Sequence, residues 1–298
     1  MKLRETLQKH KVLLADGAMG TLLAERGKLQ PGEPPELLNL SDPEAVERVH
    51  KDYLEVGSKI ILTNTFGANP FKLARLGLAR KLDRIIGQGC AIANQAKRGK
   101  DLLIAADIGP SGELLSPLGR ITPKELADGY RKVVLSFSGS GIDFFLVETL
   151  SSIEEGRIIA ETIAEKEELP IIISFTFSPG KKGPKTLLGE EPKDVVKTFE
   201  KMVFGIGTNC GSGSKEAEKV IADLRRWTNL PLWVKPNAGN PKLVKGKTVF
   251  PENPQVMASQ IKPLVDAGAS IIGGCCGTTP DHIAAFQKVL SDLRLFQE

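Results

Sequence analysis

Short apolar runs that end in polar or glycine residues recur eight times along the chain. Each run is rich in Val, Ile, Leu or Phe, and its hydrophobicity is continuous rather than alternating. A parallel strand covered on both faces requires such a run, and the gaps between the runs are long enough to hold crossover helices. The runs lie at 12–18, 59–66, 102–109, 144–150, 171–177, 204–210, 230–239 and 270–277.

Helix starts between these runs are marked by a capping residue followed by proline. The pairs are Asp42-Pro43, Thr122-Pro123, Asn253-Pro254 and Thr279-Pro280, and each puts proline at the first helical position, where its missing N–H costs nothing. No Pro/Gly/Ser-rich linker divides the chain, so two doubly wound domains are disfavoured. The pattern predicts an α/β fold, a single (β/α)8 TIM barrel over residues 1–298.

Charge and hydropathy exclude several classes of function. The 298 residues include 40 basic and 36 acidic side chains, a net charge of +4, without a basic run interleaved with aromatics, so no nucleic-acid surface is expected. Nowhere do 18 apolar residues run together, and the amino terminus lacks a secretory pattern. We therefore predict a cytoplasmic protein that does not bind membranes.

The carboxyl ends of all eight barrel strands meet at one mouth, which is where barrel enzymes bind substrates. Each polar residue there has a structural explanation as a turn, a helix cap or an ion-pair partner, and only their common placement indicates a site. The residues are Asp16, Asn64, Thr65, Asp107, Glu148, Asn209, Cys210, Asn237, Cys275 and Cys276.

Three of the four cysteines belong to this mouth. Cys210 ends the sixth run and the adjacent Cys275 and Cys276 end the eighth, so that only the seventh strand separates them. Adjacent cysteines are poor disulfide partners, whereas three thiolates suit tetrahedral zinc and leave one coordination position open. Both neighbours can be ligands only if the backbone bends, which Gly273, Gly274 and Gly277 would permit. Core packing or a redox pair are the alternatives.

The remaining candidate metal ligands lie elsewhere in the sequence. His10, His50 and His282 are near helix starts or on helical faces, outside any metal-ligand spacing from the cysteines, and are interpreted as surface or packing residues. Cys90 has the surroundings of a buried helical cysteine.

A zinc ion with three thiolates is a weak activator of water, but a thiol can occupy its fourth position and lose its proton on binding. The predicted substrate is therefore a thiol. Glu148 and Asp107 could hold an ammonium group, and backbone N–H groups around Asp16-Gly17-Ala18 and Thr65 could hold a carboxylate. An amino acid with a thiol side chain fits both.

Two long loops follow strand ends at the predicted mouth, at 27–36 and 239–254. Long loops on this face are candidate lids. A surface insertion or an extra hairpin is the alternative interpretation, especially for the lysine-rich second loop.

Six motifs stand out along the chain: LLADGAMGTLL, LTNTFGAN, DIGPSGELLSPLG, GTNC, KPNAG and GGCCGTTPDHI. Together they resemble the homocysteine S-methyltransferase family. The match spans residues 12 to about 285, and the motif sequences are most similar to those of the homocysteine-binding barrel of cobalamin-dependent methionine synthase. The resemblance implies zinc on Cys210, Cys275 and Cys276, with homocysteine sulfur as fourth ligand and Asn237 as a ligand when substrate is absent. It also implies that Glu148 takes the amino group and that the Asp16-Gly17-Ala18 loop lines the substrate site.

The methyl donor is expected from outside the chain, because the sequence ends after the barrel and lacks an Asp-x-His-x-x-Gly cobalamin signature. A separate methyl-corrinoid protein, or methylcobalamin, is the first expectation, and S-methylmethionine or another small sulfonium or ammonium donor is the second.

Two further classes of function remain open. Residues 211–214 (Gly-Ser-Gly-Ser) precede a helix and could hold a phosphate-bearing substrate. A non-catalytic, zinc-stabilised module that binds a partner within a corrinoid complex is the other.

Overall fold

The computed structural model describes residues 2–30, 32–180, 183–211, 213–244 and 246–295. Eight strands form one sheet in which every hydrogen-bonded neighbour is parallel, in the order β1-β10-β7-β6-β5-β4-β3-β2. A parallel bridge between Ala15 and Ile60 joins the first strand to the second. The predicted (β/α)8 barrel is confirmed, with strands β1 Leu13–Leu14, β2 Ile60–Leu62, β3 Leu103–Ile108, β4 Phe144–Leu150, β5 Ile171–Phe175, β6 Gly205–Cys210, β7 Leu232–Pro236 and β10 Ile271–Ile272.

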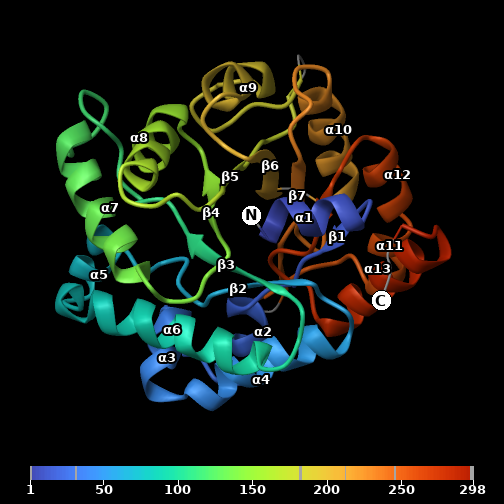
Figure 1. Ribbon diagram of the computed structural model, residues 1–298, viewed down its shortest axis with the longest axis horizontal. Helices are drawn as coiled ribbons and strands as arrows, with labels where there is room; N and C mark the ends of the chain where they lie inside the picture. Colours follow the sequence, from blue (N-terminus) through green and yellow to red (C-terminus); the bar gives the residue numbers. More distant parts are fainter. Residues whose placement is uncertain (1, 31, 181–182, 212, 245, 296–298) are drawn as a thin grey trace.

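Helices surround this barrel (Figure 1). All four predicted capping-residue and proline pairs begin helices, and the capping box of Thr122 with Glu125 is formed. The main covering helices are α4 Pro43–Glu55, α6 Leu82–Lys97, α7 Pro123–Phe137, α8 Ile153–Ala164, α9 Pro192–Phe199, α10 Ser214–Arg225, α12 Ile261–Asp266 and α13 Pro280–Asp292. The other helical segments are α1 Lys2–Lys9, α2 Gly20–Glu25, η1 Pro35–Leu37, α3 Leu38–Ser41, α5 Pro70–Arg75, η2 Ala79–Lys81 and α11 Pro254–Ala258.

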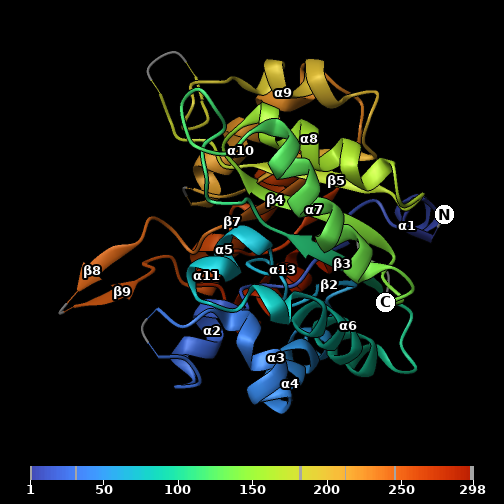
Figure 2. The ribbon, with the colours of Figure 1, turned by 90° about the vertical axis from the view of Figure 1, so that its left-hand side faces the viewer.

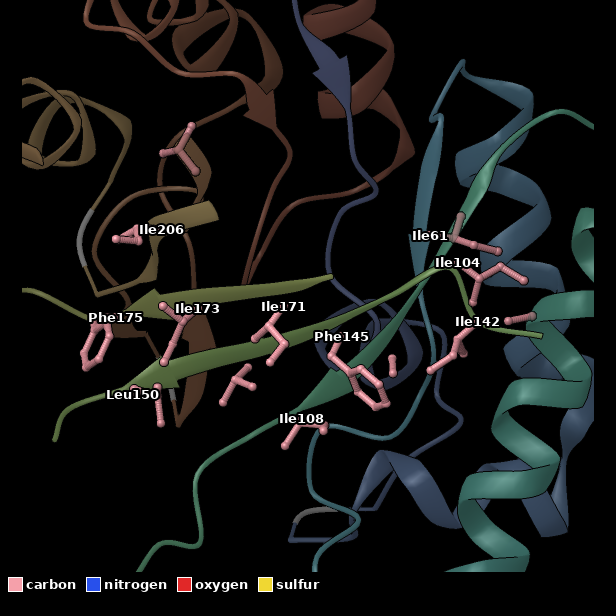
Figure 3. Close-up of a cluster of buried hydrophobic side chains, with 14 of the residues drawn as sticks. Ile61, Ile104, Ile108, Ile142, Phe145, Leu150, Ile171, Ile173, Phe175 and Ile206 are labelled. Atoms are coloured by element: carbon pink, nitrogen blue, oxygen red, sulfur yellow. The ribbon is translucent and has the colours of Figure 1, made fainter. Parts of the chain in front are cut away.

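Each of the eight barrel strands is buried on both faces, which explains the continuous apolar runs. Side chains such as Phe144 and Trp233 fill the inside of the barrel, where Leu3 of α1 joins them. Side chains of opposite parity, such as Phe145 and Ile173, pack between the sheet and the helices (Figure 3). Among the described residues, no helix is long and apolar enough to cross a membrane.

The two long loops predicted at the mouth differ in structure. The 27–36 segment follows the short helix α2 and leads into η1, so it does not leave a strand directly; residue 31 lies outside the described residues. The 239–254 segment contains an antiparallel hairpin, β8 Lys242–Val244 with β9 Lys247–Val249, which confirms the hairpin interpretation; residue 245 lies outside the described part. Figure 2 shows this hairpin projecting from the side opposite the amino-terminal helix α1.

Candidate functional site

The three predicted thiols meet. The sulfur atoms of Cys210, Cys275 and Cys276 all lie within 4.8 Å of one another and form a group that could hold a metal ion. Cys210 is the last residue of β6 and has φ 58°, in the left-handed region that non-glycine residues seldom occupy. Such strain is retained where the surrounding structure requires it, often at functional sites.

The paired cysteines lie in the predicted bend, but its glycines act in two ways. Only Gly277 has a positive φ, of 80°. A Cβ on Gly273 would lie 2.7 Å from the Asp16 carbonyl oxygen, and one on Gly274 would lie 2.4 Å from Thr278 Oγ1. These two glycines therefore allow close approach of neighbouring chain, and only Gly277 supplies the unusual backbone angle.

Hydrogen bonding divides the protons unequally among the thiols. The Cys275 and Cys276 thiols donate to the Cys210 sulfur and lower the pKa of Cys210 to about 3. The same bond to Cys210 raises the pKa of Cys276 to about 12 and that of Cys275 well above its ordinary value. A metal that bound all three sulfurs would therefore have to displace the protons of Cys275 and Cys276.

Asn237 lies beside this cluster. Its Nδ2 donates to the Gly211 carbonyl oxygen at 3.1 Å, and its side chain hydrogen-bonds Cys210. Its Oδ1 is buried without a partner among the described residues. The position suits the additional ligand that was predicted for a substrate-free site.

A cavity of about 410 Å³ opens beside the sulfurs. Its volume lies within the range of small-molecule sites. Of the predicted residues it includes Asp16, Gly17, Ala18, Asn64, Asp107, Glu148 and the three cysteines. It adds Met19, Gly20, Thr21, Pro35, Glu36, Leu62, Thr63, Phe66, Thr149, Lys235 and Gly274.

Two carboxylates at the cavity are incompletely paired. Asp107 Oδ1 and Glu148 Oε2 are buried and have no hydrogen-bond partner among the described residues. Burial raises the pKa of Glu148 to about 7, and burial followed by repulsion from Glu148 raises that of Asp107 well above its usual range. A cation placed between them would supply the missing donors and favour their ionised forms.

Asp16 lines the cavity, and its carboxylate is hydrogen-bonded within the protein. Its Oδ1 accepts from Lys235 Nζ at 2.7 Å and its Oδ2 accepts from the Leu62 N–H at 2.8 Å. The N–H of Asp16 is bound to the Ile60 carbonyl oxygen, and that of Ala18 to Thr278 Oγ1 at 3.1 Å. Two of the three main-chain donors of this loop that were expected to receive a carboxylate are therefore already used.

Thr65 is not one of the residues that line the cavity. Its N–H is bound to the Thr63 carbonyl oxygen, and its hydroxyl donates to the Asp107 carbonyl oxygen at 2.8 Å. Thr63 and Asn64 line the cavity instead. The N–H predicted to hold a carboxylate is thus engaged within the protein.

Lys235 is the main residue that the sequence interpretation missed. It is 3% exposed, belongs to β7 and forms a buried ion pair with Asp16. A lysine inside the apolar run LPLWVKPN was an available signal, because lysine is almost never fully buried without a partner.

The other candidate ligands stay apart from the cluster. His50 is buried in α4, and His282 is a capping partner of Thr279 with its Nε2 3.0 Å from the Glu252 carbonyl oxygen. Cys90 is buried in α6, as predicted.

The carboxylate of Glu252 lies at the start of the helix that follows the predicted phosphate loop, 211–214. Ser214 Oγ donates to Glu252 Oε2 at 3.0 Å, and a Cβ on Gly213 would lie 2.3 Å from Glu252 Oε1. Ser212 lies outside the described residues. An acidic side chain already at this position argues against a phosphate there.

The sequence is similar to those of known proteins. The sequence model of the family described as "Homocysteine S-methyltransferase" matches residues 13–290. The chain is 32% identical to a methionine synthase of Mycobacterium leprae over 94% of its length, and 30% identical to homocysteine S-methyltransferase 3 of Arabidopsis thaliana over 85%. It spans 82% of the plant protein but only about a quarter of the mycobacterial synthases.

Solved structures agree with the sequence comparison. The homocysteine methyltransferase MmuM from Escherichia coli has been solved in metallated, oxidized and apo forms. Its metallated form superposes with a TM-score of 0.80 at 27% identity, and the match covers 97% of this chain and 99% of MmuM. The chain belongs to the homocysteine S-methyltransferase family.

Proposed function

We propose that this protein is a zinc-dependent methyltransferase that transfers a methyl group to the sulfur of homocysteine and produces methionine. The arrangement that carries this proposal is one cavity with three cysteine sulfurs and with unpartnered oxygens of Asp107 and Glu148. A thiol group and an ammonium group on one substrate would match these two features. Membership of the family supports homocysteine as that substrate.

The donor set fits zinc. Three cysteine sulfurs are soft ligands, and three protein ligands leave one position of a tetrahedral site for a substrate atom. Asn237 Oδ1, which has no partner, would complete the set in the absence of substrate. Bound zinc would hold the substrate sulfur and lower its pKa, so that it is a thiolate near neutral pH.

The protein side chains orient the substrate. Glu148 and Asp107 would accept hydrogen bonds from the ammonium group, and the apolar side chains of Met19, Leu62 and Phe66 restrict water in the cavity. During transfer a bond forms between sulfur and the methyl carbon while the bond from carbon to the donor breaks. The donor keeps that electron pair, and the thiol proton leaves when the substrate binds.

We propose a separate methyl-corrinoid protein, or methylcobalamin, as the donor. The similarity to methionine synthases supports it. The β8–β9 hairpin also exposes Leu243 by 78% and Val244 by 48%, an apolar surface that a large donor could contact. S-methylmethionine is the second candidate, because the cavity has the size of a small-molecule site and the plant homocysteine S-methyltransferase is similar over most of its own length.

A donor comparison tests the proposal. Purified zinc-loaded protein is given homocysteine with methylcobalamin, S-methylmethionine, betaine or methyl-folate, and methionine is measured. We expect product with methylcobalamin. Product from S-methylmethionine alone would select the second donor. If zinc and homocysteine bind and none of the donors yields methionine, the non-catalytic partner-binding module becomes the better assignment.

Substitutions test the roles of the residues. Cys210→Ala, Cys275→Ala and Cys276→Ala should each lose zinc and activity together, whereas Glu148→Ala should keep zinc and weaken homocysteine binding. Cys90→Ala is the matched control, because Cys90 is a buried cysteine outside the metal group. Zinc and activity that survive all three cluster substitutions would refute the site.

A further inference from the structure

Lys235 brings a buried cation to the cavity. Its side chain is 4% exposed, and its Nζ lies 2.7 Å from Asp16 Oδ1. An ammonium group has three N–H donors, and Asp16 is its only hydrogen-bond partner among the described residues. Buried donors without an acceptor are costly, so a ligand that supplies acceptor oxygens would be favoured here.

Unpaired acceptors lie in the same cavity, on Asp107 and Glu148. Lys235 and Glu148 line the same cavity. Their opposite charges act on each other there, since Glu148 helps to raise the pKa of Lys235 and Lys235 acts to lower that of Glu148. The cavity thus has spare donors and spare acceptors within electrostatic reach of each other. An α-amino acid, which carries a carboxylate and an ammonium group on one carbon, has the complementary pattern.

Most other hydrogen-bond donors near the first strands already have acceptors within the protein. The N–H groups of Asp16 and Ala18 are used, and the Asn64 amide donates to the Pro35 carbonyl oxygen and to Asn39 Oδ1. In that loop the N–H of Gly17 remains without a partner among the described residues. It could assist, but it carries no full charge.

We propose that Lys235 binds the α-carboxylate of the thiol substrate and thereby selects α-amino acids over simple aminothiols. The inference rests on the proposed function for its choice of substrate. Asp16 is the positioning residue: it holds the ammonium group at one oxygen and is itself fixed by the Leu62 N–H at the other. Lys235 is then a substrate-binding residue.

Substrate analogues isolate this contact. Dissociation constants are measured by calorimetry on the zinc-loaded protein for homocysteine, for 3-aminopropane-1-thiol, which lacks the carboxylate, and for 4-mercaptobutanoate, which lacks the ammonium group. In Lys235→Met we expect the preference for homocysteine over 3-aminopropane-1-thiol to fall about 10- to 150-fold, the range for a hydrogen bond to a charged group. The preference over 4-mercaptobutanoate should change less than threefold. Glu148→Gln should show the opposite pattern.

Two controls keep the result interpretable. Lys235→Met leaves Asp16 buried without its cation, so Asp16→Asn/Lys235→Met is measured as well and should show the same loss of preference. A retained preference in both variants would overturn the inference, even if the wild type makes methionine. If the preference falls but the wild type transfers methyl from no donor, the inference stands and the proposed reaction fails. Failure of the wild type to bind homocysteine would overturn both.

Discussion

The buried Asp16–Lys235 ion pair gives a direct test of how the mouth is stabilised. Lys235→Met keeps an apolar stem and removes the cation, so that Asp16 retains only the Leu62 N–H. Burial already raises the pKa of Asp16 against the opposing effect of Lys235. Without Lys235 that pKa must rise further, and the carboxyl group is either charged and unpaired or protonated.

Removing one partner of a buried pair costs about 3–5 kcal/mol, well above the roughly 1 kcal/mol of an average substitution. At about 2–4 °C per kcal/mol, the midpoint of thermal unfolding should fall by roughly 6–20 °C. Asp16→Asn/Lys235→Met removes both charges and should cost less than Lys235→Met alone.

Unfolding by urea, followed by circular dichroism on metal-free protein, measures these differences. Because the variant binds a proton at Asp16 in the folded state that the unfolded state releases at neutral pH, its stability should fall as pH rises. The deficit relative to wild type should therefore be larger at pH 8 than at pH 5. A cost below 1 kcal/mol for Lys235→Met, or a double variant that costs the sum of the two single variants, would refute this reasoning.

Three further predictions concern the surroundings of the metal group. Gly277→Ala should lower both thermal stability and zinc affinity, because φ is 80° there and a Cβ would lie 2.2 Å from the Phe250 ring; unchanged zinc titration would contradict it. Zinc affinity should fall about 100-fold per pH unit as pH drops from 8 to 6, because Cys275 and Cys276, whose pKa values are raised (to about 12 for Cys276), both lose a proton when zinc binds. Competition with a chelator measures this pH dependence, and an affinity that does not change with pH would contradict the prediction. Asn209→Ala should destabilise the protein by about 1–3 kcal/mol and raise the KM for homocysteine. The reason is that Asn209 Oδ1 accepts from the Thr149 N–H and Asn209 Nδ2 donates to the Thr149 hydroxyl, near the end of β4. Urea unfolding and steady-state kinetics measure the two effects, and wild-type values in both would argue against this role.

The sequence predicted the barrel well because its main signal is local. Continuous apolar runs and capping residues before proline report burial and helix starts without any knowledge of distant contacts. The hairpin at 242–249 was only an alternative, since Lys242 and Leu243 are exposed and leave no burial pattern in the sequence. The Asp16–Lys235 pair joins residues 219 positions apart and depends on barrel closure, which no local pattern records.

Strand parity explains which of the predicted polar residues line the cavity. Side chains two residues apart share a face, so Asp107 and Glu148 follow residues that point into the barrel and enter the cavity with them. Lys235 follows Trp233 in the same way. The same rule favours Asn64 over Thr65 as a cavity residue, because Asn64 lies two positions after Leu62, and the structure agrees. Applying it strictly to each apolar run would have identified Lys235 and placed Thr65 outside the cavity.

Parity fails for the metal group, and the failure has a physical cause. Cys210 follows Ile206 and Thr208, so an extended β6 would direct its sulfur toward the helices rather than the cavity. It reaches the cluster because its backbone adopts φ 58°, and Gly211 continues the turn at φ 63°. Cys276 likewise departs from the parity of Cys275 in a bend that ends at Gly277. Strain at a non-glycine residue needs compensation, and three mutually hydrogen-bonded sulfurs provide it before a metal is bound. Bonds from these sulfurs to a metal would replace the weaker hydrogen bonds, so we expect the turn at Cys210 to be the part of the mouth most dependent on metal binding, and the barrel strands below it the least.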